Sequence, residues 1–151
     1  MYPRVWTPHV TVAAVIEHEE HFLLVEEIAD GRRVYNQPAG HLESGESLLD
    51  AVRREVLEEA ASHFEPTGVI GVYRWVHPES GETHMRVAFH GALTGSEPGR
   101  SLDDCIVAPH WLTYEDIAGL GRALRSPMVL GCIDDYRRGR SFPLDLLREL
   151  A

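Results

Sequence analysis

The chain has 151 residues, of which 44% are hydrophobic and 25% charged, and its formal net charge is −10 at pH 7. These values are typical of a single globular domain, which we expect over residues 1–151. The acidic balance argues against a nucleic-acid partner, because phosphate backbones require a basic surface.

Membrane and secreted proteins are also disfavoured as classes. No apolar run approaches the roughly 20 residues of a membrane helix, and the N-terminus resembles no signal peptide. Cys105 and Cys132 lie far apart in sequence, which suits free thiols in a reducing compartment. We therefore expect a cytoplasmic protein without a membrane partner, either a monomer or a homodimer. The chain contains no lysine, which excludes Schiff-base and P-loop chemistry.

Six segments have the residue types and flanking turns of β-strands: residues 10–16, 21–27, 33–40, 68–76, 83–93 and 106–112. The first two flank a polar turn, and the fourth and fifth flank a turn rich in Pro, Ser and Gly, so each pair predicts a hairpin. The third strand is expected to end at Pro38 and Gly40. Residues 94–104 have the composition of a surface loop.

Two helical regions accompany these strands. The first covers residues 47–61, with Ser47 and Asp50 spaced as a capping box. The second begins weakly at residues 113–120, where Thr113 and Asp116 provide a cap. It resumes at residues 126–139, with Ser126 as N-cap and Pro127 at the first helical position. This order predicts an α/β fold with a mixed sheet and helices on either side.

The first helix carries Glu55, Glu58 and Glu59 on one arc near its C-terminal end. Like charges at this spacing cost about 0.2–0.5 kcal/mol per pair, and the helix dipole adds to the cost. One explanation is a solvated acidic face relieved by Arg53 and Arg54. The other is a divalent cation, because Mg²⁺ prefers hard oxygen ligands. The predicted buried stripe beside this arc consists of Leu49, Val52, Val56 and Ala60.

A wider pattern surrounds these glutamates. Gly40, Glu46 and the segment Arg54–Glu59, REVLEE, occur at fixed separations that resemble the Nudix box. The resemblance implies the Nudix α/β/α sandwich, with a mixed β-sheet between helices. Ala61 and Ser62 depart from the pattern, since the family has glycine and usually an apolar residue there. Leaving the helix at Ala61 requires a left-handed conformation that is costly for alanine.

The resemblance extends over nearly the whole chain. The segments PHVTVAAVI, LLVEE, NQPAGHLE and YRRGRSFPLDLL resemble the NudJ-type phosphatase branch of the family. This branch implies hydrolysis of nucleoside tri- and diphosphates and of thiamine-type pyrophosphates, with release of orthophosphate. The enzymatic alternative is an ADP-ribose or dinucleotide pyrophosphohydrolase. A non-catalytic Nudix-fold nucleotide sensor is the alternative of another class, and the retention of all four box glutamates disfavours it.

The resemblance also implies roles for the box residues in a water attack assisted by Mg²⁺ or Mn²⁺. Glu55, Glu58, Glu59 and the carbonyl of Gly40 are the expected metal ligands. Glu46 is expected to bind the metal directly or through water. Arg54 is expected to hold the carboxylates in place, although a surface ion pair predicts almost the same contacts.

The general base and the substrate contacts are less determined. The base is either Glu59 inside the box, or Asp103 or Asp104 in the loop before the last strand. Five residues are candidates for substrate binding, as ring-stacking groups, as neighbours of the box or as a phosphate ligand: Tyr35, Trp75, Asn36, Gln37 and Arg86. Aromatic residues on strands are more often core residues, and surface arginines are usually solvated.

Overall fold

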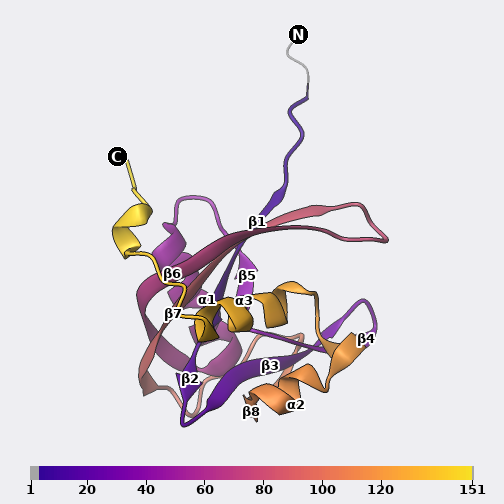
Figure 1. Ribbon diagram of the computed structural model, residues 1–151, viewed down its shortest axis with the longest axis vertical. Coiled ribbons are helices and arrows are strands. Elements are labelled where there is room, and N and C mark those ends of the chain that lie inside the picture. The colour runs from indigo at the N-terminus through magenta and orange to yellow at the C-terminus, as the bar shows by residue number, and fades with distance from the viewer. Residues whose placement is uncertain (1–3, 151) are drawn as a thin grey trace.

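The computed structural model describes residues 4–150 (Figure 1). Its strands are β1 (His9–Val15), β2 (Glu17–His18), β3 (His21–Ala29), β4 (Arg32–Asn36), β5 (Ala39–His41), β6 (Ser62–Val76), β7 (Thr83–Ser96) and β8 (Ile106–Thr113). Its helices are α1 (Leu48–Ala60), α2 (Tyr114–Ala118) and α3 (Met128–Arg137), with two 3₁₀ turns, η1 (Gly121–Ala123) and η2 (Leu144–Leu146).

The strands form two sheets. The first has the order β5-β1-β7-β6, and it is mixed because β1 runs parallel to β7 while its other pairs are antiparallel. The second is antiparallel, with β3 pairing with β2, β4 and β8. In this arrangement the long β6–β7 hairpin and the short strand β5 lie on opposite sides of β1.

Alternating side chains on the first sheet bury two apolar clusters, one against each helix. Val12, Val87 and Phe89 belong to the cluster that includes α1, whereas Val15 and Ala88 belong to the cluster that includes α3. Figure 1 accordingly shows α1 and α3 on opposite sides of this sheet. The predicted α/β sandwich with a mixed sheet between helices is confirmed.

The hairpin predicted for residues 10–16 and 21–27 forms only around its turn, where Glu17 pairs with Phe22 and His18 with His21; residues 10–16 do not take part in this pairing. The segment 11–16 is buried throughout, because β1 is a central strand flanked by β5 and β7. The chain turns after it and enters the second sheet. A single hydrogen bond from the Leu23 N–H to the Ile16 carbonyl, 3.0 Å long, joins the two segments.

Several element boundaries also differ from prediction. The segment 33–40 is divided between β4 and β5, which lie in different sheets. Strand β6 begins at Ser62, directly after α1, and β7 continues to Ser96 within the expected loop. Pro66 is tolerated in β6 because β6 is an edge strand and its pairing is irregular there. The second hairpin, the final strand and the helical regions occur where they are predicted. Helix α3 begins one residue later than predicted, with Pro127 instead of Ser126 as N-cap.

Both ends of α1 follow from its sequence. Ser47 is the N-cap, and its side chain accepts a 3.0 Å hydrogen bond from the Asp50 N–H. At the other end Ala61 adopts the left-handed conformation, with φ 50° and ψ 37°. The strain expected where alanine replaces the box glycine is therefore present in the backbone.

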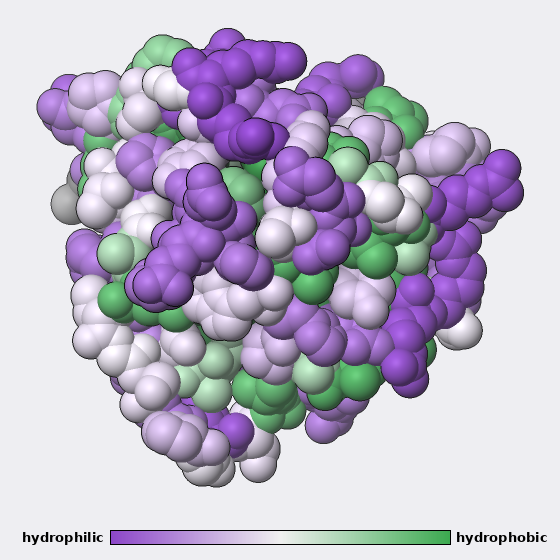
Figure 2. Space-filling view, turned by 60° about the horizontal axis from the view of Figure 1, so that its bottom comes forward, coloured by the Kyte–Doolittle hydropathy of each residue, from purple (hydrophilic) through white to green (hydrophobic). Residues whose placement is uncertain are grey.

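The surface is largely hydrophilic on the face that Figure 2 presents, where apolar areas are small and separated by polar side chains. In the segment 4–150 no helix is long and apolar enough to cross a membrane.

Candidate active site

Arg54 links the N-terminal part of α1 to the loop that precedes it. Its guanidinium donates to both carboxylate oxygens of Glu46, at 3.0 and 2.7 Å, and to the His41 carbonyl at 3.0 Å. It also donates to Glu55 at 2.7 Å and to Glu58 at 3.2 Å. The hydrogen bonds with Arg54 lower the pKa of Glu46, and those with Glu46 raise the pKa of Arg54. One cation thus orients three of the box carboxylates.

Three carboxylates converge beyond this arginine. Oxygen atoms of Glu55, Glu58 and Asp103 all lie within 4.8 Å of one another. The Asp103 N–H donates to the Glu58 carbonyl at 3.0 Å, which holds the 94–104 segment against α1. Burial raises the pKa of both Glu55 and Glu58. The donors are all hard oxygen atoms and carry like charge, so the set fits a divalent cation such as Mg²⁺.

Gly40 packs directly against this cluster. A Cβ atom at residue 40 would lie 2.2 Å from the Glu55 carboxylate, so any other residue there would displace that carboxylate. Gly40 pairs with Val12 in the first sheet, which fixes its position relative to α1. The spacing of Gly40 and Glu55 in the box therefore reflects a direct contact between the two residues.

Glu59 lies apart from the three grouped carboxylates. It is 5% exposed, and its Oε1 atom accepts a hydrogen bond from the Ala39 N–H at 2.9 Å. Burial raises the pKa of Glu59 to about 9. Of the predicted buried stripe of α1, Val52 and Val56 are fully buried, while Glu55 and Glu59 share that burial with them. The helix therefore turns two glutamates inward rather than toward solvent.

A cleft of about 650 Å³ opens beside Gly40. A row of rings, one from each strand of the first sheet, crosses its wall: His41, His9, His84 and Trp75. The His9 and His41 rings share a 2.9 Å contact between nitrogen atoms, and the His9 and His84 rings stack with centroids 4.9 Å apart. The Trp75 and His84 centroids are 5.6 Å apart. The sequence analysis missed this ring row, because only the parallel pairing of β1 with β7 brings His9 and His84 together.

Arg86 supplies a buried positive charge to the same cleft. Its two terminal nitrogen atoms donate to Gln37 at 2.8 Å and to Asn36 at 3.0 Å. Gln37 in turn donates to the Val129 carbonyl of α3 at 2.8 Å. Among the described residues no hydrogen-bond partner reaches the Arg86 Nε atom, although the side chain is buried. Such a fixed guanidinium is suited to an anionic ligand.

The other residues predicted to bind substrate have different positions. Trp75, Asn36 and Arg86 line the cleft, whereas Gln37 lies behind Arg86 and supports it. Tyr35 is not among the lining residues. It packs against the cluster that includes α3, with its ring 6.0 Å from the ring of His110.

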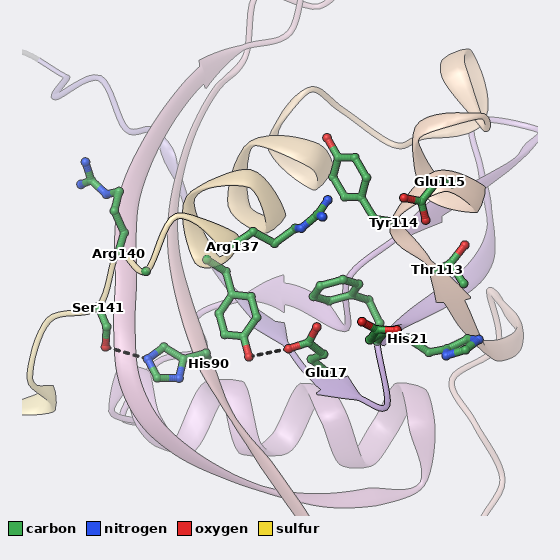
Figure 3. A pocket seen from close by; sticks show the side chains of 13 residues that line it. Glu17, His21, His90, Thr113, Tyr114, Glu115, Arg137, Arg140 and Ser141 are labelled. Carbon is green, nitrogen blue, oxygen red and sulfur yellow. Dashed lines mark hydrogen bonds between the residues drawn. The ribbon is translucent and has the colours of Figure 1, made fainter.

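A second cavity, of about 690 Å³, lies near the C-terminal end of α3 (Figure 3). Its walls carry the hydrogen-bonded pairs Tyr136–Glu17 and His90–Ser141. None of the box carboxylates lines either cavity. Although this cavity is slightly larger, the cleft beside Gly40 is the candidate active site because Gly40, which packs against the Glu55 carboxylate, lines it.

The chain has clear relatives among known proteins. Residues 7–130 match the model of the NUDIX domain. The chain is 37% identical over 140 residues to phosphatase NudJ from Escherichia coli K12, which covers 93% of this chain and 90% of the relative. A solved NUDIX hydrolase from Nitrosomonas europaea is 44% identical, with a TM-score of 0.94 over 95% of this chain and 98% of the other.

More distant structures share the fold alone. The MutT NUDIX hydrolase from Burkholderia pseudomallei is 21% identical, with a TM-score of 0.73 over 86% of this chain and 98% of the other. The resemblance to the Nudix family and to its NudJ-type members, predicted from the box and the flanking segments, is confirmed. The protein therefore belongs to the Nudix family, and it is a Nudix hydrolase.

Proposed function

We propose that this hydrolase cleaves phosphoanhydride bonds in nucleoside tri- and diphosphates, with Mg²⁺ or Mn²⁺ as cofactor, and releases orthophosphate. Thiamine-type pyrophosphates are proposed as further substrates. The observation that carries the proposal is the grouping of Glu55, Glu58 and Asp103 beside Gly40, next to a cleft with a buried arginine. The similarity to phosphatase NudJ supports the choice of bond and product.

The proposed metal ligands are the carboxylates of Glu55, Glu58 and Asp103, with Glu59 and the Gly40 carbonyl as further ligands predicted from the box. A bound divalent cation would polarise the phosphoryl oxygens and lower the pKa of a water molecule. Arg54 keeps the carboxylates oriented through its four side-chain hydrogen bonds to them. Glu46 anchors Arg54, so its role is to position the arginine.

We assign the general base to Glu59, with Asp103 and Asp104 as the alternatives. A base is most effective when its pKa lies near the working pH. Burial raises the pKa of Glu59 to about 9 in the metal-free protein, and a divalent cation bound nearby would lower it from that value. The Ala39 N–H fixes the orientation of the Glu59 carboxylate. Asp103 is already placed within the ligand group, which favours a ligand role for it.

The substrate is proposed to lie along the cleft from the carboxylates to the ring row. Arg86 is positioned to pair with a phosphate oxygen, held by Asn36 and Gln37. Trp75 and the neighbouring histidine rings offer stacking surfaces for a nucleobase or a thiamine-type ring. The acidic overall charge and the cleft of about 650 Å³ beside Gly40 support a small-molecule substrate. Both cysteines are free thiols, which supports a cytoplasmic location.

The first product distinguishes this proposal from its main alternative. A nucleoside triphosphate cut at its outer linkage releases orthophosphate, whereas a cut between the inner phosphates releases pyrophosphate. We expect orthophosphate in early time points of a Mg²⁺-containing reaction analysed by ion chromatography. Pyrophosphate as the first product would show that a different bond is cleaved from the one proposed here. The protein would still be a hydrolase. Hydrolysis of ADP-ribose in preference to any triphosphate would favour the pyrophosphohydrolase alternative.

A further inference from the structure

The cleft does not end at the ring row. Beyond Trp75 it continues into a second hollow of about 660 Å³, which we call the outer lobe. Six residues line both spaces: Asp30, Trp75, His77, Glu79, Arg125 and Ser126. Trp75 therefore lies between two adjoining spaces, one beside Gly40 and one beside the turns that join β3 to β4 and α2 to α3.

The outer lobe differs from the inner cleft in charge. Three arginines line it, Arg32, Arg122 and Arg125, against the two carboxylates Asp30 and Glu79. The inner cleft has the reverse balance, with two arginines and four carboxylates. The lobe is therefore less negative than the inner cleft, although the charge of Arg125 is balanced by the buried Glu27. The charges that attract an anionic group are then the guanidinium groups of Arg32 and Arg122.

Two of these arginines are available to a ligand. Arg125 is engaged, since it forms an ion pair with the buried Glu27. In the part of the chain that the structure describes, neither Arg32 nor Arg122 forms an ion pair, and Arg32 donates a 3.2 Å hydrogen bond to the Arg122 carbonyl. That bond ties the Arg32 side chain to the backbone of Arg122, and both residues line the same hollow. Guanidinium groups bind phosphate oxygens with charged hydrogen bonds.

The rest of the wall is apolar. Val34, Pro78, Leu124, Pro127 and Leu130 line the lobe beside Trp75. An inorganic ion would leave this surface uncovered, so the chemistry fits a phosphate that is attached to a sugar or a ring. The apolar wall would contact the organic part, and the arginines would contact the phosphate.

We propose that the outer lobe binds a second phosphate group of the substrate, remote from the phosphoanhydride that is cleaved. The substrate class is then a nucleotide that carries a 2′- or 3′-phosphate on its sugar as well as a 5′-polyphosphate. This assignment rests on the proposed function for the inner cleft, but the lobe's affinity for phosphate does not depend on hydrolysis.

The test compares ligands that differ by a single phosphate. AMP, adenosine 2′,5′-bisphosphate and adenosine 3′,5′-bisphosphate contain no phosphoanhydride, so calorimetric titration measures binding alone. We expect one bisphosphate to bind the wild-type protein about tenfold more tightly than AMP, as charged hydrogen bonds of this kind provide. Arg122→Ala and Arg32→Ala should each reduce that preference, and the double variant should abolish it. Arg100→Ala, an exposed arginine paired with Glu97 elsewhere, is the matched control and should retain it.

Equal binding of AMP and both bisphosphates by the wild type overturns the proposal, as does a preference that survives in the double variant. The absence of binding by all three ligands overturns it as well. Hydrolysis of ADP is measured in parallel on the same samples. If ADP is not hydrolysed but the bisphosphate preference is present, the proposed function fails while the outer lobe stands. If ADP is hydrolysed without any preference, only the outer lobe fails.

Discussion

Arg54 makes the dense negative charge of α1 tolerable at the scale of single residues. Its fork of donors reaches Glu46, Glu55 and Glu58 at the same time, which a lysine ammonium cannot do in the same geometry. Without it, the carboxylates would face one another with only solvent between them. The same set of contacts therefore fits both explanations of Arg54, as an ion-pair partner of the glutamates and as a group that positions them.

Glu58 provides the sharpest test of the carboxylate cluster. Glu58→Gln keeps the shape of the side chain and removes its charge, so we expect kcat to fall by about 10²-fold or more with an unchanged circular dichroism spectrum. Glu65→Gln is the matched control, because Glu65 is exposed and pairs with Arg53 outside the cluster. Wild-type turnover in Glu58→Gln would contradict the prediction and would indicate that Glu58 is only a solvated surface residue.

Glu59 predicts a pH dependence of stability in the metal-free protein. Burial raises its folded-state pKa to about 9, above the ordinary value of 4.5 for a glutamate, so the folded state binds more protons than the unfolded state between these values. The free energy of unfolding therefore falls as pH rises through this window. We expect the melting temperature in EDTA to decrease from pH 7 to pH 9, and to decrease less in Glu59→Gln. Equal slopes for the two proteins would contradict the prediction.

Local geometry explains which site residues could be predicted from sequence. Helical spacing alone places Glu55, Glu58 and Glu59 near one another, and the box spacing identifies Gly40. The convergence of Asp103 with Glu55 depends on a loop that folds back across more than forty residues, so sequence reasoning could only offer it as an alternative. The inward position of Glu59 was also beyond prediction, because it depends on the Ala39 N–H of a neighbouring strand.

At the scale of elements, the C-terminal end of α1 carries a measurable strain. Ala61 has a φ of 50°, a conformation that costs an L-residue about 1–2 kcal/mol and costs glycine little. Ala61→Gly should therefore raise the free energy of unfolding by about 1 kcal/mol, and the melting temperature by roughly 2–4 °C.

The control for Ala61→Gly is Ala60→Gly, one residue earlier and still within the helix. There glycine should be destabilising by about 0.5–1 kcal/mol. Thermal unfolding of both variants under the same conditions shows whether each substitution raises or lowers the stability. A lower melting temperature for Ala61→Gly would show that the lost methyl contacts outweigh the relief of strain.

The elements that were predicted correctly are those with local signals. Capping residues marked the starts of α1 and α2, and turn residues marked the β6–β7 hairpin. The first hairpin is right only around its turn. Beyond the turn it failed, because two β-prone runs with a polar turn give the same signal whether the strands pair or separate into two sheets. The parallel β1–β7 pairing joins segments about 75 residues apart, and no short-range pattern reports it.

At the scale of the whole molecule, α3 connects the chemistry of the cleft to the core. Ser126, which precedes the helix, and Met128, its first residue, line the cleft. Gln37 ties the Val129 carbonyl of the helix to Arg86. Tyr73 and Tyr114 donate 2.7 Å hydrogen bonds to Asp135 and Asp134 further along the helix. The buried arginine is thus held by contacts that span the first sheet and the helix above it.

A divalent cation should stabilise the whole fold if the carboxylates form its site. A ligand that binds only the folded state at 100 times its Kd adds about 2.7 kcal/mol to the free energy of unfolding, which corresponds to a rise in melting temperature of roughly 5–10 °C for a chain of this size. We expect Mg²⁺ and Mn²⁺ to produce such a rise, and EDTA to reverse it.

The double variant Glu55→Gln, Glu58→Gln should lose the response to metal. It should be no less stable than the wild type in EDTA, because it removes two like charges whose pKa values burial already raises. Melting curves that coincide with and without metal would rule out the cluster as a cation site, whatever the activity of the enzyme.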